Sequence, residues 1–587
     1  MDLFEYAWLT SFQITKKDHD KVKVLLRDDV KYPMLGKDRR GQVVYLAKPK
    51  RRPDKLMSYL GLLFDLNNEL HRRILWQTFK ASVFHLSTHV AASDFGAYAD
   101  WSRGKNIDSA TYIAGMIEDA TARAYLKTVW TPFINDVAMA NTISYLKMKP
   151  VHLLSNSALR LMTATTSQFS MGTIKGRTTN EMKGDVTDLV SALNKIEGVM
   201  QQEAIKNAKS EQEDHTSQKP SDLAVNYKIG QADFMYRIME RYGEPSEIPS
   251  LLYTENHGSN SIFYGYDLPS ENEVKTNLEN ALGILKPATK ENGSQNGLED
   301  IALKSEVSQV FSSLEAKEAA QNKILDGYRL LGKGSRFHSF EFPQEDYSEY
   351  LYIKSLLANQ IRRVLEKLRL YRNQSGEDYR HEVGLLDMQE AIQVIASKSK
   401  RTDVFMRDEL QTREDAWAIL VDTSHSLEFF TGEVRGIALC LSEVARDLFP
   451  NQNAWSEYAF SDKFYIIKDF TENYNNRIRA RVGGLEHGGM SYIPDALVLA
   501  AEALKTRTEE LRLLVVVSDF FPSGYMDAEG TLTQAVKKIE KSGMGVIGIG
   551  VKSRAVKNYF RINCVVDEPY ELMKKFVQAF FEFSSTA

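Results

Sequence analysis

The spacing of hydrophobic residues changes near residue 412. Between residues 57 and 200, apolar residues recur every three or four positions, as in LMSYLGLLFDLNNELHRRILW, which predicts a domain of amphipathic helices. The same pattern returns over 226–411 and predicts a second helical region. Residues 201–225 are polar and predict an exposed linker, and 286–297 predict a polar insert. Residues 1–56 are mixed and contain short strand-like runs such as QVVYLA.

Residues 412–587 follow a different pattern. Apolar runs typical of buried strands (DAWAILVD, LRLLVVVSD, GVIGIGV) alternate with amphipathic helices such as GEVRGIALCLSEVARDLF. Strands that alternate with helices predict a mainly parallel sheet covered on both faces. The expected fold class is therefore multi-domain, with a mostly α-helical N-terminal region and a C-terminal α/β, Rossmann-like domain. In such sheets, functional residues lie at the carboxyl ends of the strands.

Composition excludes several classes of protein. The 587 residues carry 74 Lys and Arg against 78 Asp and Glu, so the net charge of −4 gives no general case for nucleic-acid binding. Cys440 and Cys564 are the only cysteines, which excludes a disulfide framework and a thiolate zinc site. No apolar run reaches the roughly 20 residues of a membrane span, and the first residues do not resemble a secretory signal. We expect a cytoplasmic protein without membrane insertion.

Five oxygen-bearing side chains follow strands of the C-terminal domain. Asp422, Ser424 and Ser426 form an Asp-x-Ser-x-Ser pattern after the first strand. Ser491 lies in a glycine loop before a helix, and Asp519 ends the strand LRLLVVVSD. Hydroxyls and carboxylates are hard ligands, suited to Mg²⁺ or Mn²⁺. Because these positions share one edge of the predicted sheet, the sequence predicts a divalent metal site there.

This constellation resembles the metal-ion-dependent adhesion site (MIDAS) of a von Willebrand factor A (VWA) domain. The resemblance implies that Ser424, Ser426 and Ser491 bind the metal directly, while Asp422 and Asp519 act mainly through bound waters. The chain departs from the family pattern in two places. Ser491 stands where threonine is usual, and SDFF at 518–521 replaces the common Thr-Asp-Gly, so a loop of different shape is expected.

The position of this domain after a long helical region resembles NorD and CbbO proteins, which partner MoxR-type AAA+ ATPases. Three short segments add to the likeness: MIED at 116–119, GLLD at 384–387 and REDAWA at 413–418. The resemblance implies an adaptor, not an enzyme, that binds a partner through the MIDAS. It would work with a MoxR-type ATPase in the activation or maturation of a client enzyme complex. No phosphate-binding Gly-x4-Gly-Lys-Ser/Thr loop occurs, so the ATPase would be another chain.

Two alternatives remain open. The chain could be an interaction module that needs no ATPase. It could also be a metal-dependent enzyme with a His85/His89/Glu118 site in the helical region, where His85 and His89 lie four residues apart and Glu118 and Asp119 follow on the next predicted helix. Leu86 stands where a zinc hydrolase carries its general-base glutamate, which argues against a protease.

Overall fold

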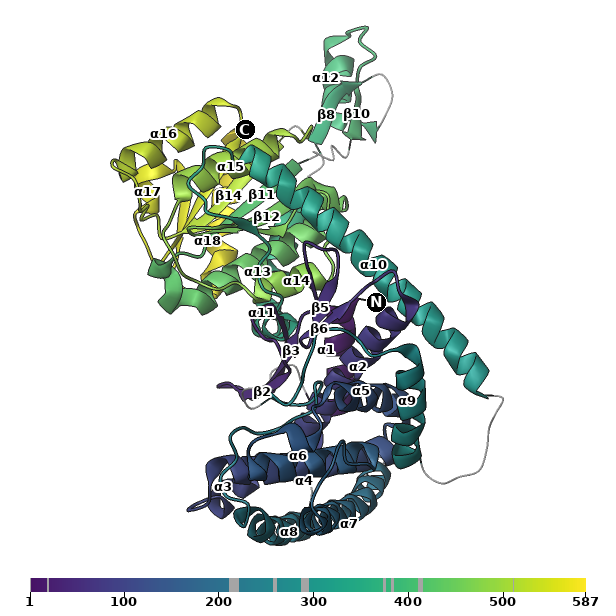
Figure 1. Cartoon of the computed structure of the whole chain (residues 1–587). Helices are drawn as coiled ribbons and strands as arrows, with labels where there is room; N and C mark the ends of the chain where they lie inside the picture. Colours follow the sequence, from purple (N-terminus) through teal and green to yellow (C-terminus); the bar gives the residue numbers. More distant parts are fainter. Residues whose placement is uncertain are drawn as a thin grey trace. The chain divides into compact units, whose positions relative to one another are not determined.

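The computed structural model describes residues 2–17, 21–210, 221–256, 261–286, 295–372, 376–381, 385–409, 415–509 and 511–586 (Figure 1). The chain forms two compact units: unit 1 is Met1–Glu318 and unit 2 is Ala319–Ala587. Helix α10, Gln295–Leu331, contains the boundary between them. Gly384, Arg413 and Glu414, which belong to the segments of NorD likeness, lie outside the described residues.

Unit 1 opens with helix α1, Leu3–Thr15, and two small sheets. Their strands are β1 (Val22–Arg27), β2 (Met34–Lys37), β3 (Gln42–Ala47), β4 (Lys50–Arg51), β5 (Met57–Tyr59) and β6 (Leu62–Phe64). Strand β3 is the predicted run QVVYLA. The prediction that a helix begins at residue 57 is wrong, because β5 and β6 pair as an antiparallel hairpin. Leu60 and Gly61 both have positive φ, +49° and +77°, as a tight hairpin turn requires.

The rest of unit 1 is helical. Its main helices are α2 (Glu69–Ala92), α4 (Ile107–Thr128), α5 (Ile134–Lys147), α6 (Ser157–Met171), α7 (Asn180–Ser210), α8 (Asp222–Glu240) and α9 (Glu271–Leu285). The short helix α3, Tyr98–Trp101, precedes α4. Helix α2 starts at the cap residue Asn68 and is buried on all sides from Ile74 to Ala92, so it forms the centre of this unit. Helix α7 extends to Ser210, inside the segment expected to be a linker, and residues 211–220 lie outside the described ones.

Unit 2 is built on a seven-stranded sheet with the order β16-β15-β14-β11-β12-β13-β7 (Figure 1). The strands are β7 (Phe340–Glu341), β11 (Asp415–Asp422), β12 (Trp455–Phe460), β13 (Phe464–Lys468), β14 (Leu511–Ser518), β15 (Gly545–Val551) and β16 (Ile562–Val566). Every neighbouring pair is parallel except β12 with β13. This confirms the predicted mainly parallel sheet.

Helices cover both faces of this sheet. On one face, Ala416, Ala418 and Leu420 of β11 share a core with helices α15 (Ile493–Lys505) and α16 (Ala528–Lys541). On the other face, Trp417 packs against Phe449, which follows α13 (Thr431–Leu448), and against Phe580 of α18 (Leu572–Thr586). Because alternate residues of β11 enter opposite cores, the strand is apolar throughout. The predicted fold class, a helical region followed by an α/β domain, is confirmed.

The other elements of unit 2 flank the sheet in sequence. They are α11 (Tyr347–Arg372), α12 (Met388–Ser397), α14 (Asn476–Gly483), α17 (Val556–Tyr559) and a small sheet of β8 (Gly376–His381), β9 (Leu385–Leu386) and β10 (Phe405–Glu409). Among the described residues of the chain, no helix combines the length and the apolar character needed to cross a bilayer.

Candidate metal sites

The carboxyl edge of the large sheet gathers the predicted metal ligands of unit 2. Strands β11 and β14 are parallel neighbours, with Val421 opposite Val517. Asp422 ends β11, and Asp519 directly follows β14. The third segment is the loop from Gly484 to Tyr492, between α14 and α15, which carries Ser491. Three segments that are far apart in sequence therefore meet at this edge.

Asp422 is the centre of the hydrogen bonds at this edge. Its side chain is fully buried, at 0% exposure. Its Oδ1 accepts a hydrogen bond from the Ser424 backbone N–H at 2.8 Å. Its Oδ2 accepts hydrogen bonds from the hydroxyls of Ser491, at 3.0 Å, and Ser518, at 2.6 Å. The carboxylate thus ties together the ends of β11 and β14 and the Ser491 loop. The sequence pattern did not reveal this role for Ser518.

The hydroxyls lead from this buried carboxylate toward the surface. The Oγ atoms of Ser424 and Ser426 lie 3.1 Å apart. Ser424 and Ser491 are buried, at 2% and 3% exposure, while Ser426 is exposed. His425 is exposed too, and its Nδ1 lies 2.8 Å from the Glu428 carboxylate. A metal held by these hydroxyls would therefore have one side open to a partner.

Backbone contacts fix the shape of the Ser491 loop. The Gly488 N–H donates to the Thr423 carbonyl at 2.9 Å, and the His425 N–H donates to the Gly489 carbonyl at 3.1 Å. Gly489 has a φ of +77°, and a Cβ at this position would lie 2.2 Å from Oδ1 of Asp462. Glycine is required here both for the left-handed backbone and for the close approach.

The loop after β14 keeps a glycine-like conformation without a glycine. Phe520 has a φ of +60°, which costs a side chain with a Cβ about 1–2 kcal/mol. Its ring is fully buried and packs on Phe560 with ring centroids 4.9 Å apart. Burial of a phenylalanine is worth more than this strain. The replacement of the usual glycine by Phe520 is therefore compatible with a left-handed turn at this position.

The electrostatics at this edge favour a bound cation. Burial, and then the charge of the neighbouring Asp519, raise the pKa of Asp422 to about 6. A divalent ion would offset both effects, because it stabilises the ionised carboxylates. Three hydroxyls and two carboxylates form a hard donor set that fits Mg²⁺ or Mn²⁺ better than zinc.

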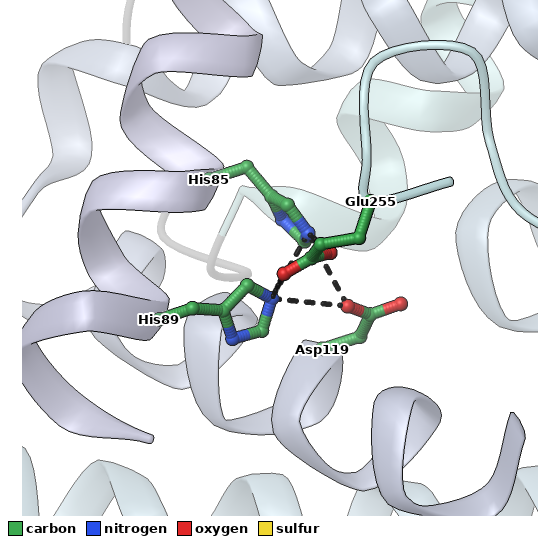
Figure 2. Close-up of side chains that lie close together, drawn as sticks. All are labelled: His85, His89, Asp119 and Glu255. Atoms are coloured by element: carbon green, nitrogen blue, oxygen red, sulfur yellow. Dashed lines mark hydrogen bonds and ion pairs between the residues drawn. The ribbon is translucent and has the colours of Figure 1, made fainter. Parts of the chain in front are cut away.

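A second cluster, which we call the His–acid cluster, lies inside unit 1. It consists of His85, His89, Asp119 and Glu255, whose ligand atoms all lie within 4.8 Å of one another. Figure 2 shows the two imidazoles on α2 facing Asp119 on α4 and Glu255 on the segment between α8 and α9. His89 is 1% exposed and His85 is 5% exposed. Burial alone lowers the pKa of His85, but the Glu255 and Asp119 carboxylates raise it to about 10.

Glu118 does not take part in this cluster, in contrast to the hypothesis of a His85/His89/Glu118 site. Its carboxylate pairs with Lys228 Nζ at 3.0 and 3.1 Å and accepts a hydrogen bond from the Tyr98 hydroxyl at 2.7 Å. Adjacent residues on a helix point about 100° apart, so only Asp119 can face α2 at the same time. Glu255 had no motif that marked it in the sequence.

Comparisons with known proteins give distant structural likenesses. No family model matches the chain, and no curated protein matches it. Among solved structures, the manganese-loaded TRAP protein of Plasmodium vivax has a TM-score of 0.23 and 14% identity over 29% of this chain and 74% of its own. A von Willebrand factor type A protein of Catenulispora acidiphila has 0.23 and 16%, over 30% and 42%. The Ro protein of Deinococcus radiodurans has 0.21 and 13%, over 88% and 84%.

These scores are too low to place the whole chain in a family. The description of unit 2 as VWA-like depends on its own architecture: a mainly parallel sheet, helices on both faces, and an Asp-x-Ser-x-Ser turn at the carboxyl end of β11.

Proposed function

We propose that the chain is a non-enzymatic adaptor that binds a partner protein through Mg²⁺ or Mn²⁺ at the carboxyl edge of unit 2. Ser424, Ser426 and Ser491 would bind the ion, and Asp422 and Asp519 would neutralise it, in part through water. The observation that carries the proposal is the buried Asp422 carboxylate, which binds hydroxyls from two other segments while Ser426 faces solvent.

The donor set also suggests what the partner offers. Three neutral hydroxyls leave a divalent ion short of negative charge, so a carboxylate from another protein would complete its coordination shell. A partner that presents an exposed Asp or Glu fits this requirement. In line with the NorD and CbbO likeness, we propose that a MoxR-type AAA+ ATPase is one partner and that a client enzyme complex, being activated or matured, is another.

The ion can be tested before the partner. The full chain is titrated with Mn²⁺, and binding is followed by the loss of the free-ion electron paramagnetic resonance signal. Zn²⁺ is added first, so that Mn²⁺ does not bind at the His–acid cluster of unit 1. We expect a site that Mg²⁺ displaces and that Ser426→Ala weakens. Ser399→Ala, an exposed serine outside the three converging segments, is the matched control and should bind as wild type does. If Ser426→Ala binds Mn²⁺ normally, the site assignment is wrong.

The partner is then tested with the same variants. A tagged chain is used to recover a purified MoxR-type ATPase from the same genome, with Mg²⁺ or with chelator. We expect recovery that needs Mg²⁺, is lost in Ser426→Ala and is kept in Ser399→Ala. Equal recovery in chelator would refute the metal-bridged mechanism. Mn²⁺ binding without any ATPase recovery would favour the interaction module that works without an ATPase.

A further inference from the structure

We propose that the His–acid cluster of unit 1 is a structural zinc site, with His85, His89, Asp119 and Glu255 as its four ligands. The site lies in a different unit from the VWA-like edge and uses a different donor set. The proposal therefore does not depend on the adaptor function.

The distances between the ligand atoms match a metal polyhedron. His85 Nε2 lies 3.0 Å from His89 Nε2, 3.4 Å from Asp119 Oδ1 and 2.9 Å from Glu255 Oε2. His89 Nε2 lies 3.3 Å from Asp119 Oδ1 and 3.1 Å from Glu255 Oε1. Zinc binds nitrogen and oxygen at about 2.0–2.2 Å, so the edges of a zinc tetrahedron are about 3.3–3.6 Å long. The five distances lie at or below these edges, with Glu255 presenting Oε2 to His85 and Oε1 to His89, and all the ligand atoms lie within 4.8 Å of one another, so a small expansion would admit the ion.

Hydrogen bonds alone cannot satisfy every contact in this cluster, because each Nε2 carries at most one proton and lies close to three other polar atoms. If both Nε2 atoms carry protons, two N–H groups face each other at 3.0 Å. If one is deprotonated, its lone pair faces carboxylate oxygens at 2.9–3.4 Å. Moreover, Glu255 Oε1 is buried and makes no hydrogen bond within the described part of the chain. A cation at the centre would convert all of these lone pairs into ligands.

The surroundings of His89 prepare it as a ligand. Its Nδ1 lies 2.8 Å from the Ser93 hydroxyl, which ends helix α2. A proton on Nδ1 that is donated to Ser93 leaves Nε2 with its lone pair directed at the cluster. Metal-binding histidines usually hold their second nitrogen in this way.

The donor set selects the class of metal. Two imidazoles and two carboxylates suit a first-row transition ion, and zinc in particular, more than Mg²⁺ or Ca²⁺. Two carboxylates and a divalent ion sum to zero charge, which lowers the cost of burying the group.

A closed, structural role fits better than a catalytic one. All four positions of a tetrahedral shell would be filled by the protein, and Leu86 stands where a hydrolase carries its general base. A cavity of about 50 Å³ adjoins His85 and Asp119 and is lined mostly by apolar side chains, which leaves little room for a substrate. The zinc would join helix α2, helix α4 and the segment between α8 and α9 that carries Glu255.

The first test is to measure zinc on the full chain. After treatment with chelating resin, the protein is given Zn²⁺, and the bound metal is counted by mass spectrometry. We expect one zinc per chain, and the X-ray absorption spectrum of wild type should show a four-coordinate nitrogen and oxygen shell at about 2.0–2.1 Å with imidazole scattering. A folded wild-type chain that retains no zinc, or that prefers iron or manganese at these residues, would overturn the assignment.

Variants then identify the ligands. His85→Ala and His89→Ala should each lower zinc affinity at least about 100-fold, whereas His338→Ala, an exposed histidine of unit 2, should not change it. Ser93→Ala should lower affinity about 10-fold through His89 while leaving the fold intact. Glu118→Gln should leave one zinc bound. Normal zinc affinity in His89→Ala would refute the site, and the Mn²⁺ titration of unit 2 would be unaffected by that outcome.

Discussion

Glu118 and Asp119 are adjacent in sequence, yet the structure gives them different partners, which a mutation series can separate. Glu118 is 1% exposed and Lys228 is 2% exposed, so their ion pair between α4 and α8 is buried. Tyr98 completes the site, because its hydroxyl donates to Glu118. Burial and the Glu118 charge raise the pKa of Tyr98, which keeps this hydroxyl protonated as a donor. The perturbation that we consider is Lys228→Met.

The expected cost follows from the burial of both charges. Removing one partner of a buried pair leaves an uncompensated charge and costs about 3–5 kcal/mol. Glu118→Gln leaves Lys228 unpaired and should cost a similar amount. The double variant buries no charge and keeps an acceptor for Tyr98, so it should be less destabilised than the sum of the singles by about 2–3 kcal/mol.

Hydrogen exchange measured by mass spectrometry is the suitable assay, because it resolves local stability within a chain of two units. Peptides from α4 and α8 report the opening free energy around the pair, and peptides from unit 2 provide an internal reference. Lys275→Met is the matched control: Lys275 forms an exposed pair with Glu271, at 2.7 Å. Its loss should change stability by less than about 0.5 kcal/mol.

Two results would refute this reasoning. Additive single variants would mean that the pair is not coupled as the geometry requires. Loss of bound zinc in Glu118→Gln, with α2 and α4 still protected, would mean that Glu118 and not Asp119 serves the His–acid cluster.

Three further predictions concern unit 2. Burial raises the pKa of Glu457 from 4.5 to about 8, so the folded chain holds a proton that the unfolded chain loses first, and wild-type stability should fall as pH rises through this range. As pH rises through this range, the free energy of unfolding of Glu457→Gln, measured in urea, should therefore increase relative to wild type by up to about a few kcal/mol. Parallel pH profiles for the two proteins would contradict this. At Phe520, whose φ is +60°, the glycine variant should be about 1 kcal/mol more stable than the alanine variant in thermal unfolding, and the reverse order would contradict the left-handed turn. Gly489→Ala should weaken Mn²⁺ binding at the unit 2 edge, because alanine disfavours the φ of +77° and its Cβ would displace the Asp462 side chain, and normal binding in the titration would contradict the assigned loop shape.

The VWA-like half of the chain could be predicted because its information is local. Buried strands with apolar residues on both faces give unambiguous runs, and the candidate ligands follow these strands by a few residues. Once β11 and β14 are recognised as parallel strands, Asp422 and Asp519 must lie at the same edge. The sequence did not reveal the hydrogen bond from Ser518 to Asp422. This bond forms because β11 and β14 are neighbouring strands, and the order of strands in a sheet cannot be read from the strand sequences.

The His–acid cluster could be predicted only in part. The i, i+4 spacing of His85 and His89 identified one face of α2, but Glu255 is 170 residues from His85 and has no spacing that links them. The helical periodicity of α4 could have shown which of the two acids, Glu118 or Asp119, faces α2. Tyr112, Met116 and Asp119 follow the 4,3 spacing of one helical stripe, which Glu118 does not join.

The hairpin β5–β6 was missed for a related reason. Its residues are mostly apolar, and a short apolar run cannot be assigned to helix or strand by periodicity alone. The Leu60-Gly61 turn decides the outcome, because two successive positive φ values reverse the chain and are incompatible with a helix.

If both proposals hold, the chain carries two metal ions that differ in how readily they exchange with solvent, and this difference assigns them different roles. A zinc held by four protein ligands whose side chains are 1–23% exposed would exchange slowly with solvent. It would therefore remain bound while the partner comes and goes. An ion held by hydroxyls beside the exposed Ser426 can exchange with solvent. Brief exposure to chelator should then remove partner binding while zinc content stays constant, so reversible control by a divalent ion would act at unit 2, and the zinc would maintain the fold of unit 1.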